Sequence, residues 1–520
     1  MQQLLEEVDV VIVGSGAAGS LMAARLAEAG QAVVILEAGK QRRSSDLVSS
    51  QIWARKLKWD GEPVVDEGQH PIGYHFNTGR GTGGSATHHY AVWPRMHPED
   101  FSVASDHGKG LDWPIRYRDL RKHYDLVQKE VGVSGDAETE HWRPEGAAYP
   151  LPPVPTFAQG RIIARGFHKL GLRTSPVPLG ITSQPYRGRG GCLWDGWCDA
   201  GCPIGALANP LAVYLPRALK AGAELRHESC VTRILTDTSG QRATGVDYVT
   251  ADGKTRTLIA ENVILAANPV QNPRLLLASA TKHHPQGLAN SSGRVGDYLM
   301  SHPSVSIYGL FEEQTENFLG ATGGQLLCQD GYEKNRHGQQ AFGSFQWLIA
   351  QAQKPNDLLG YANCRPGLFG SELTAFMQQA SSHLATMTSV CEGLPLASNK
   401  VRLSTQRFDS NGVPLAQVSH RFADESLALA EKSRQQGERI FEAAGAQEVW
   451  SSRVNSMHIM GGTIMGNDSG SSVTNSYGQT HDLPNLFIAG AGLFPTSGGV
   501  NPTFTLHALA DRAADRIANA

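Results

Sequence analysis

Short, almost continuous hydrophobic runs alternate along this chain with segments of helical periodicity. Residues 8–13 are nearly all apolar, as in a strand buried on both faces of a parallel sheet. A helical segment follows at 20–29, Gly30 ends it, and a second buried strand is predicted over 31–36. These three segments form a βαβ unit, so the sequence predicts a parallel sheet at its N-terminus.

Buried-strand and helical patterns return in the second half of the chain. Pro-rich sequence between residues 144 and 155 indicates a crossover into another domain. The pattern beyond it predicts strands at 231–236, 243–250, 255–259, 262–267 and 485–488, and the periodicity predicts helices at 113–133, 427–443 and 503–517.

Composition narrows the class of protein. The 520 residues are long enough for two interleaved domains around a large core. Hydrophobic residues make up 40% and charged residues 18%, and the formal net charge of −3 disfavours nucleic acid as a partner. No run of 18 apolar residues exists, and the first residues lack a basic segment followed by an apolar one, so we predict no export or membrane signal in the chain.

Three glycines separate the first strand from the first helix. Gly14, Gly16 and Gly19 have the spacing that lets a backbone turn approach a pyrophosphate at a helix N-terminus. Glu37 ends the second strand, where a carboxylate binds the hydroxyls of an adenosine ribose. The sequence therefore predicts a dinucleotide site.

Three of the seven cysteines lie within eleven residues. Cys192, Cys198 and Cys202, with Pro203 after the last, follow the pattern C-x5-C-x3-C-P. Thiolates on one loop suit a soft metal centre, and a proline after the last ligand is typical of iron–sulfur loops. A zinc site completed by a distant residue and cysteines without a metal remain alternatives. An odd total does not favour a disulfide framework.

Four segments together resemble the glucose-methanol-choline (GMC) oxidoreductase family of FAD flavoproteins: the N-terminal unit and residues 83–88, 264–277 and 456–502. The resemblance implies an α/β fold in which a Rossmann-like FAD-binding domain is interleaved with a substrate domain on a mainly antiparallel sheet with helices. We accordingly assign the FAD-binding domain to residues 1–110, 205–305 and 450–520, the substrate domain to 111–185 and 306–449, and an iron–sulfur cluster loop to 186–204.

The resemblance also indicates a catalytic pair. His458 matches the family's catalytic base, and Asn501 stands 43 residues later, at the family's spacing for the partner. An imidazole accepts a hydroxyl proton at neutral pH, while an amide orients the same oxygen without titrating. The alternatives are a core histidine for His458 and a turn residue before Pro502 for Asn501.

Further FAD contacts follow from the resemblance. Gly83, Gly84 and Ser85 match the loop over the flavin ring, and Ala267 lies in the family's second signature. His88 stands where some members link a histidine covalently to the flavin. A histidine that only contacts the flavin or a phosphate occupies the same loop, so both interpretations stay open.

One position departs from the family pattern. Many members carry an acidic residue after the strand that ends here at Ile488, whereas this chain has Gly490 and Ala491. We expect backbone N–H groups there to contact the cofactor instead.

One branch of the family predicts the function more closely. Flavoprotein subunits of bacterial glucose, fructose, sorbitol and gluconate dehydrogenases carry a 3Fe–4S cluster on a similar cysteine triad. The resemblance implies a dehydrogenase that oxidises an alcohol group of a sugar, sugar acid or polyol, with electrons leaving through the cluster to an acceptor such as a cytochrome c subunit. In such complexes a small subunit carries the export signal, so we predict a periplasmic protein that is membrane-associated through its partners, or a cytoplasmic protein if no partner exists.

Two other functions remain as alternatives. The chain would be an oxidase if oxygen accepts the electrons and the cysteines are structural, or a flavin-containing lyase without net redox turnover. The substrate is not predicted, because the region from 305 to 450 holds no motif. Gln346, Trp347 and His383 are polar or aromatic candidates for sugar contacts, although each also suits ordinary packing or the surface.

Overall fold

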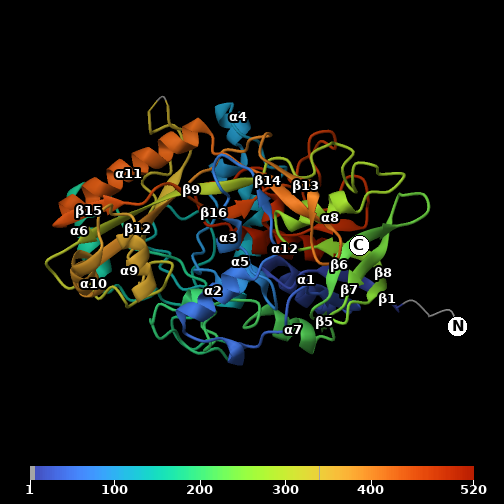
Figure 1. Ribbon diagram of the computed structural model, residues 1–520, viewed down its shortest axis with the longest axis horizontal. Helices are drawn as coiled ribbons and strands as arrows, with labels where there is room; N and C mark the ends of the chain where they lie inside the picture. The colour runs from blue at the N-terminus through green and yellow to red at the C-terminus, as the bar shows by residue number, and fades with distance from the viewer. Residues whose placement is uncertain (1–5, 339, 520) are drawn as a thin grey trace.

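The computed structural model describes residues 6–338 and 340–519 and contains the predicted N-terminal βαβ unit (Figure 1). Strands β1 (Glu6–Val13) and β2 (Val33–Leu36) are parallel and are joined by helix α1 (Ala17–Glu28). The other edge of β1 pairs in parallel with β8 (Thr255–Leu265). The sheet runs in the order β5-β2-β1-β8-β7-β6, and β17 also pairs with β8. The added strands are β5 (Glu224–Arg226), β6 (Cys230–Thr236), β7 (Ala243–Val249) and β17 (Leu486–Ile488).

Strand β8 corrects one prediction. The sequence predicted separate strands at 255–259 and 262–267, but the structure has a single strand. Its first half pairs antiparallel with β7, and its second half lies between β1 and β17. The polar residue between the two apolar runs, Glu261, is exposed, so it does not interrupt the strand.

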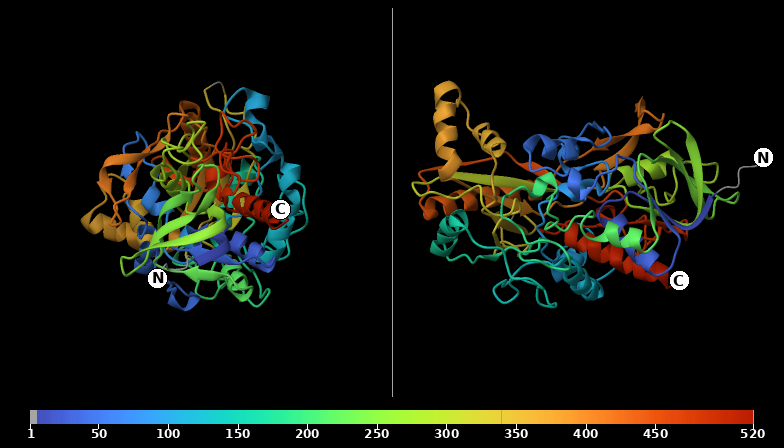
Figure 2. Two further views of the ribbon diagram at one scale, coloured as in Figure 1. Left: turned by 90° about the vertical axis from the view of Figure 1, so that its right-hand side faces the viewer. Right: turned by 90° about the horizontal axis from the view of Figure 1, so that it is seen from below.

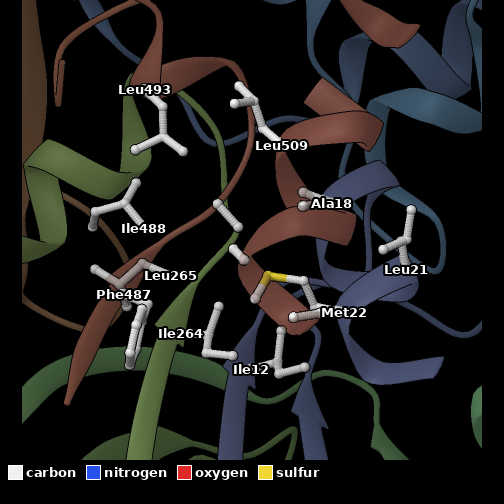
Figure 3. Packing of buried hydrophobic residues seen from close by; sticks show 14 of the residues in the cluster. Ile12, Ala18, Leu21, Met22, Ile264, Leu265, Phe487, Ile488, Leu493 and Leu509 are labelled. Atoms are coloured by element: carbon white, nitrogen blue, oxygen red, sulfur yellow. The ribbon is translucent and has the colours of Figure 1, made fainter. Parts of the chain in front are cut away.

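Two helices from opposite ends of the chain cover this sheet together. Helix α12 (Thr503–Ala518) lies beside α1, and Met22 packs against Ile12 and Ile264 (Figure 3), with Leu509 of α12 in the same core. Strands β1, β8 and β17 are parallel, so their carboxyl ends share one edge of the sheet. Ligands of such sheets bind at this edge.

The second sheet is antiparallel, as the resemblance implied for the substrate side. Its order is β15-β9-β12-β11-β10-β4, with β16 also paired to β9. Helices α6 (Ala158–Lys169) and α11 (Asp424–Ala444) pack together, and α11 lies against β9 and β12 (Figure 1). The strands are β4 (Ser175–Pro176), β9 (Met300–Leu310), β10 (Leu326–Cys328), β11 (Phe345–Ile349), β12 (Leu384–Cys391), β15 (Glu448–Ser451) and β16 (Asn455–Met460).

The domain boundaries stay predictions. Those placed after residues 305 and 449 fall inside β9 and β15, so each of these strands is divided between the two assigned domains. The two parts of the molecule therefore share strands at the place where they meet.

The remaining elements connect the two large sheets, and helices α9 and α10 project from one end of the molecule (Figure 2). Helix α5 (Tyr117–Val131), with α11 and α12, confirms the predicted helices. Within the described chain, no helix has both the length and the apolar character needed to cross a membrane. A small sheet contains β3 (Val65–Asp66), β13 (Lys400–Phe408) and β14 (Pro414–Ser419), and the other helices are α2 (Gln51–Trp59), α3 (Tyr74–Asn77), α4 (Val103–His107), α7 (Tyr214–Lys220), α8 (Gln271–Ala278), α9 (Pro355–Ala362) and α10 (Gly370–His383), with 3-10 turns η1 (Ser44–Asp46), η2 (Gly84–His88), η3 (Pro98–Phe101), η4 (Cys198–Ala200) and η5 (Ala491–Leu493).

Candidate functional site

One cavity of about 930 Å³ begins at the carboxyl ends of the parallel strands and extends to the antiparallel sheet. Its size is near the upper end for ligand pockets, as expected for a large cofactor together with a substrate. Gly19 and Gly83 do not line it. The predicted site residues that do are Gly14, Gly16, Glu37, Gly84, Ser85, His88, Ala267, His458, Gly490, Ala491 and Asn501.

The turn after β1 fits a pyrophosphate. Gly14 has φ +104°, and a Cβ there would lie 2.8 Å from the Ala266 carbonyl oxygen. A Cβ on Gly19 would lie 2.1 Å from the Gly14 carbonyl oxygen, whereas a Cβ on Gly16 would lie 4.0 Å from the Gly83 carbonyl oxygen. Helix α1 begins at Ala17 with no side chain capping its first N–H groups. Those N–H groups therefore remain available to an anion at the cavity.

Glu37 organises the backbone around this turn. Its carboxylate accepts hydrogen bonds from the Ser15 hydroxyl at 2.7 Å, the Ser15 N–H at 3.2 Å, and the Gly39 and Gly81 N–H groups at 2.8 and 3.0 Å. The Gly83 N–H in turn donates to the Ser15 hydroxyl at 3.0 Å. Glu37 thus joins the first glycine motif to the loop at 79–85, and its contact with a ribose stays a prediction.

His88 has an unsatisfied ring nitrogen next to the cofactor end of the cavity. Its side chain is buried at the end of η2, and Nε2 has no hydrogen-bond partner among the described residues. Burial and the nearby Lys58 lower the pKa of His88 to about 3, so the ring is neutral at physiological pH. In contrast, His89 bonds the Ala86 carbonyl through Nδ1 and accepts from Trp93 through Nε2. Of the two histidines, His88 is the one with a ring nitrogen that lacks a partner among the described residues, and its contact with a flavin stays a prediction.

The predicted catalytic pair is in contact. The Asn501 Nδ2 group lies 3.1 Å from His458 Nε2. Strand β16 carries His458 at an irregularity in its pairing with β9, where His458 has φ +62°. A non-glycine residue in this left-handed region is strained and is held there by its surroundings. The irregularity directs the ring toward the cavity that Asn501 also lines.

The structure adds a residue that sequence reasoning missed. His302, fully buried on β9, has Nδ1 3.0 Å from His458 Nδ1 and Nε2 2.9 Å from the Gly498 carbonyl oxygen. Burial and the neighbouring His302 hold the pKa of His458 well below its usual range, and burial lowers the pKa of His302 to about 4. Both rings are therefore neutral at pH 7.

Uncharged polar side chains line the cavity along the antiparallel sheet. Ser304 and Ser306 come from β9, and Thr388 comes from β12. The Ser306 and Thr388 hydroxyls are 2.9 Å apart, and Thr388 donates to Gln351 Oε1 at 2.6 Å. These groups both donate and accept hydrogen bonds, as hydroxyl groups of a ligand require.

The three residues considered for sugar contacts do not line this cavity. Gln346 is fully buried behind it and donates to Asn501 Oδ1 at 2.8 Å. Trp347 packs in the core of the antiparallel sheet, and His383 Nδ1 bonds the Glu313 carbonyl at the surface. The type of these residues alone did not reveal whether their side chains face the cavity.

The three clustered cysteines share one apolar cluster, against which Met457 also packs. Backbone N–H groups donate to the sulfurs of Cys192 and Cys202 at 3.4 Å each. All seven cysteines are free. In the part of the chain that the structure describes, no three or more His, Cys, Asp or Glu residues are grouped as ligands of a metal ion.

Charged residues fasten the cysteine loop to the cavity wall. Asp199, next to Cys198 in η4, forms buried ion pairs with Lys58 at 3.0 Å and Lys354 at 3.5 Å. Lys58 also lines the cavity. The turn η4 contacts both α2 and η2, the turn that carries His88. The cysteine loop is therefore a direct neighbour of the predicted flavin site.

Comparisons with known proteins agree with this geometry. Sequence models of the GMC oxidoreductase family match residues 8–304 and 370–510. The chain is 32% identical to 2-methyl-1,2-propanediol dehydrogenase of Mycolicibacterium austroafricanum, over 98% of this chain and 95% of that protein. It is 30% identical to the fructose dehydrogenase large subunit of Gluconobacter japonicus, over 98% of each. The structure of an Aspergillus oryzae formate oxidase superimposes with a TM-score of 0.68 at 16% identity, covering 98% of both chains.

Proposed function

Because this chain belongs to the GMC oxidoreductase family, we propose that it is a dehydrogenase of a neutral sugar, polyol or diol whose electrons leave through a 3Fe–4S cluster. The chain is an FAD-dependent oxidoreductase acting on CH–OH groups. The substrate class, the cluster and the electron acceptor are the proposed parts. The position of the cysteine loop beside the flavin site carries the proposal.

The residues of the cavity fit FAD. The glycine turn before α1 would hold the pyrophosphate, the glycine loop before His88 would hold the flavin, and the backbone at Gly490 would complete the cradle. Bound FAD would supply the hydride acceptor. A hydroxyl group bound beside His458 Nε2 and Asn501 Nδ2, which lie 3.1 Å apart, would give its proton to the imidazole while the amide donates to its oxygen.

The uncharged part of the lining along the antiparallel sheet favours a neutral substrate. Ser304, Ser306, Thr388 and Gln351 offer hydroxyl and amide groups without a charge. A carboxylate at this wall would lose its hydration without gaining a cationic partner from these four residues. A relative named for 2-methyl-1,2-propanediol and another named for fructose both act on neutral hydroxyl compounds, which supports the same class.

A 3Fe–4S cluster would bind the thiolates of Cys192, Cys198 and Cys202. Each thiolate of such a cluster binds a different iron, so the cysteines need not converge on one ion. The apolar surroundings and the N–H donors to two of the sulfurs suit a cluster, whose potential depends on both. A one-electron carrier beside the flavin gives electrons an exit that an oxidase does not need.

The electron acceptor is proposed to be an external carrier such as a cytochrome c subunit. The relative named as a large subunit supports assembly with other chains. We propose a small partner that carries the export signal and brings this chain to the periplasmic side of the membrane. Export of this chain when it is expressed without companions would contradict that part.

The first test is anaerobic bleaching of the bound flavin by a panel of diols, polyols, ketoses, aldoses, sugar acids and simple alcohols. We expect neutral hydroxyl compounds to bleach the flavin and sugar acids to fail. Bleaching by sugar acids alone would contradict the neutral substrate class. A flavin that dithionite reduces but no alcohol bleaches would favour the lyase.

The cluster is tested by iron and acid-labile sulfide in protein purified without air. We expect about three irons and four sulfides per chain, both lost in Cys198→Ser and kept in the matched control Cys364→Ser, since Cys364 lies outside the cluster of three. Wild-type protein that bleaches but contains no iron, and whose reduced flavin reacts rapidly with oxygen, would establish the oxidase instead.

A further inference from the structure

We propose that His302 is a positioning residue that holds His458 in the tautomer with hydrogen on Nδ1 and the lone pair on Nε2. The inference rests on the proposed role of His458 as base. Its evidence is a continuous set of buried hydrogen bonds that approaches the His458 ring from two sides. The side that begins at a backbone carbonyl fixes the tautomer, and the other side is consistent with it.

The first side begins at a backbone carbonyl. The Gly498 oxygen can only accept, so the His302 Nε2 atom that lies 2.9 Å away must carry a hydrogen. Neutral His302 then has its lone pair on Nδ1. His458 Nδ1, 3.0 Å from that lone pair, must donate to it. His458 Nε2 is consequently left unprotonated, facing the cavity.

The second side is a row of three amides. Gln329 Nε2 donates to Gln346 Oε1 at 3.0 Å, Gln346 Nε2 donates to Asn501 Oδ1 at 2.8 Å, and Asn501 Nδ2 reaches His458 Nε2 at 3.1 Å. In this arrangement each amide oxygen accepts and each NH2 group points toward the active site. The Asn501 NH2 group then donates to His458 Nε2, which is consistent with a hydrogen on Nδ1.

His97 lies at the start of this row, with Nε2 3.1 Å from Gln329 Oε1. His302, Gln329 and Gln346 are nearly or fully inaccessible to solvent, so water does not compete for these bonds. None of the three lines the cavity, which separates their role from direct contact with substrate.

The tautomer matters for the proton transfer. The O–H bond of the alcohol breaks, its proton forms a bond to His458 Nε2, and the hydride leaves the same carbon for the oxidant that the enzyme binds. His458 becomes an imidazolium whose Nδ1–H still donates to His302. A ring with its hydrogen on Nε2 would present a donor to the hydroxyl and could not accept the proton, as other histidine bases show when their orienting partner is removed.

The matched substitutions are His302→Leu and His302→Asn. Leucine removes the acceptor for His458 Nδ1–H, whereas the asparagine oxygen takes the approximate place of the lost Nδ1 atom. We expect His302→Leu to slow flavin reduction on the order of 100-fold at saturating substrate, with little change in substrate dissociation constant or flavin content. His302→Asn should remain within about tenfold of wild type. An equal loss of the flavin-reduction rate in both variants, or no loss in His302→Leu, would overturn the proposal.

A second measurement needs no variant at His302. Nitrogen-15 NMR of ring-labelled histidines in the oxidised holoprotein distinguishes protonated from unprotonated ring nitrogens, and the signals lost in His458→Asn identify His458. We expect a protonated Nδ1 and an unprotonated Nε2; the opposite pattern would refute the inference. The NMR measurement does not depend on turnover. If no alcohol reduces the flavin of the wild-type enzyme, the proposed function is refuted, but the spectrum still tests the tautomer of His458.

Discussion

At the scale of single residues, the site contains histidines whose environments keep them neutral. His458 and His88 both lie against the cavity, and burial disfavours the charged form of each ring. A neutral ring serves different purposes at the two positions. His458 needs a lone pair to accept a proton, and His88 needs one to bond or contact the flavin.

The first prediction concerns pH. A base is competent only when unprotonated, and the pKa of His458 is held well below its ordinary value of about 6.5, so activity is lost only as pH falls through that lowered pKa. We expect the rate of flavin reduction by substrate to stay constant from about pH 8 down to about 6.5. Stopped-flow absorbance in a pH series measures it, and a half-maximal rate at or above pH 6.5 would contradict the assignment.

The second prediction concerns the flavin linkage, which the structure leaves open. If the unsatisfied Nε2 of His88 forms the covalent bond, acid precipitation leaves the flavin in the wild-type pellet and releases it from His88→Ala. His89→Ala is the matched control, because both ring nitrogens of His89 already have partners, and it should retain the flavin. Complete release from wild type would show that His88 only contacts the flavin.

At the scale of elements, the position of α1 against β1 depends on a glycine contact. The Gly19 backbone approaches the Gly14 carbonyl so closely that a Cβ would lie 2.1 Å from its oxygen. We expect Gly19→Ala to push α1 from the turn and to lower both FAD content and melting temperature. Gly360 in α9 has open space around it, so Gly360→Ala should leave flavin content unchanged and alter stability by no more than about 1 kcal/mol. Fluorimetric melting and flavin absorbance compare the two, and an intact Gly19→Ala holoenzyme would refute the packing argument.

The local sequence pattern was sufficient to predict an element and its function where the residues involved are contiguous in the chain. The turn at Gly14 and the neighbouring helix could be predicted because strand, glycines and helix are contiguous. The partners of β9 could not, since β12, β15 and β16 follow it by about eighty to one hundred and fifty residues. His302 became meaningful only once this pairing brought it to His458, although the resemblance had already supplied His458 and Asn501.

At the scale of the whole molecule, a buried group of charges connects the cysteine loop to both sides of the cavity. Asp199 contacts Lys58 from α2 and Lys354 from the segment before α9, and all three side chains are nearly buried. Burial alone would raise the pKa of Asp199, but the two ammonium groups outweigh it and lower that pKa. A lowered carboxylate pKa stabilises the folded protein at neutral pH, and that contribution is lost as the pH falls through about 4 and below.

Removing this shared carboxylate gives the fourth prediction. Asp199→Asn should reduce the free energy of unfolding by about 3 kcal/mol at pH 7, because the buried Lys58 loses this ion pair, while Lys354 retains Asp357 at 3.2 Å. The exposed pair between Glu313 and Arg165 provides a control, and Glu313→Gln should cost less than about 1 kcal/mol. Urea denaturation measures both, and a loss for Asp199→Asn no larger than that of the control would contradict the prediction.

Strand β9 also has a consequence for how selectivity can evolve in this protein. Side chains two residues apart share one face of a strand, so His302, Ser304 and Ser306 form a single row. The first member supports the proton acceptor, while the next two line the space for the substrate. Substitutions at the later positions can therefore alter which alcohol is accepted while the pairing that holds the base stays in place. The residue that supports the base and the residues that face the substrate lie on one strand, but they can be substituted independently.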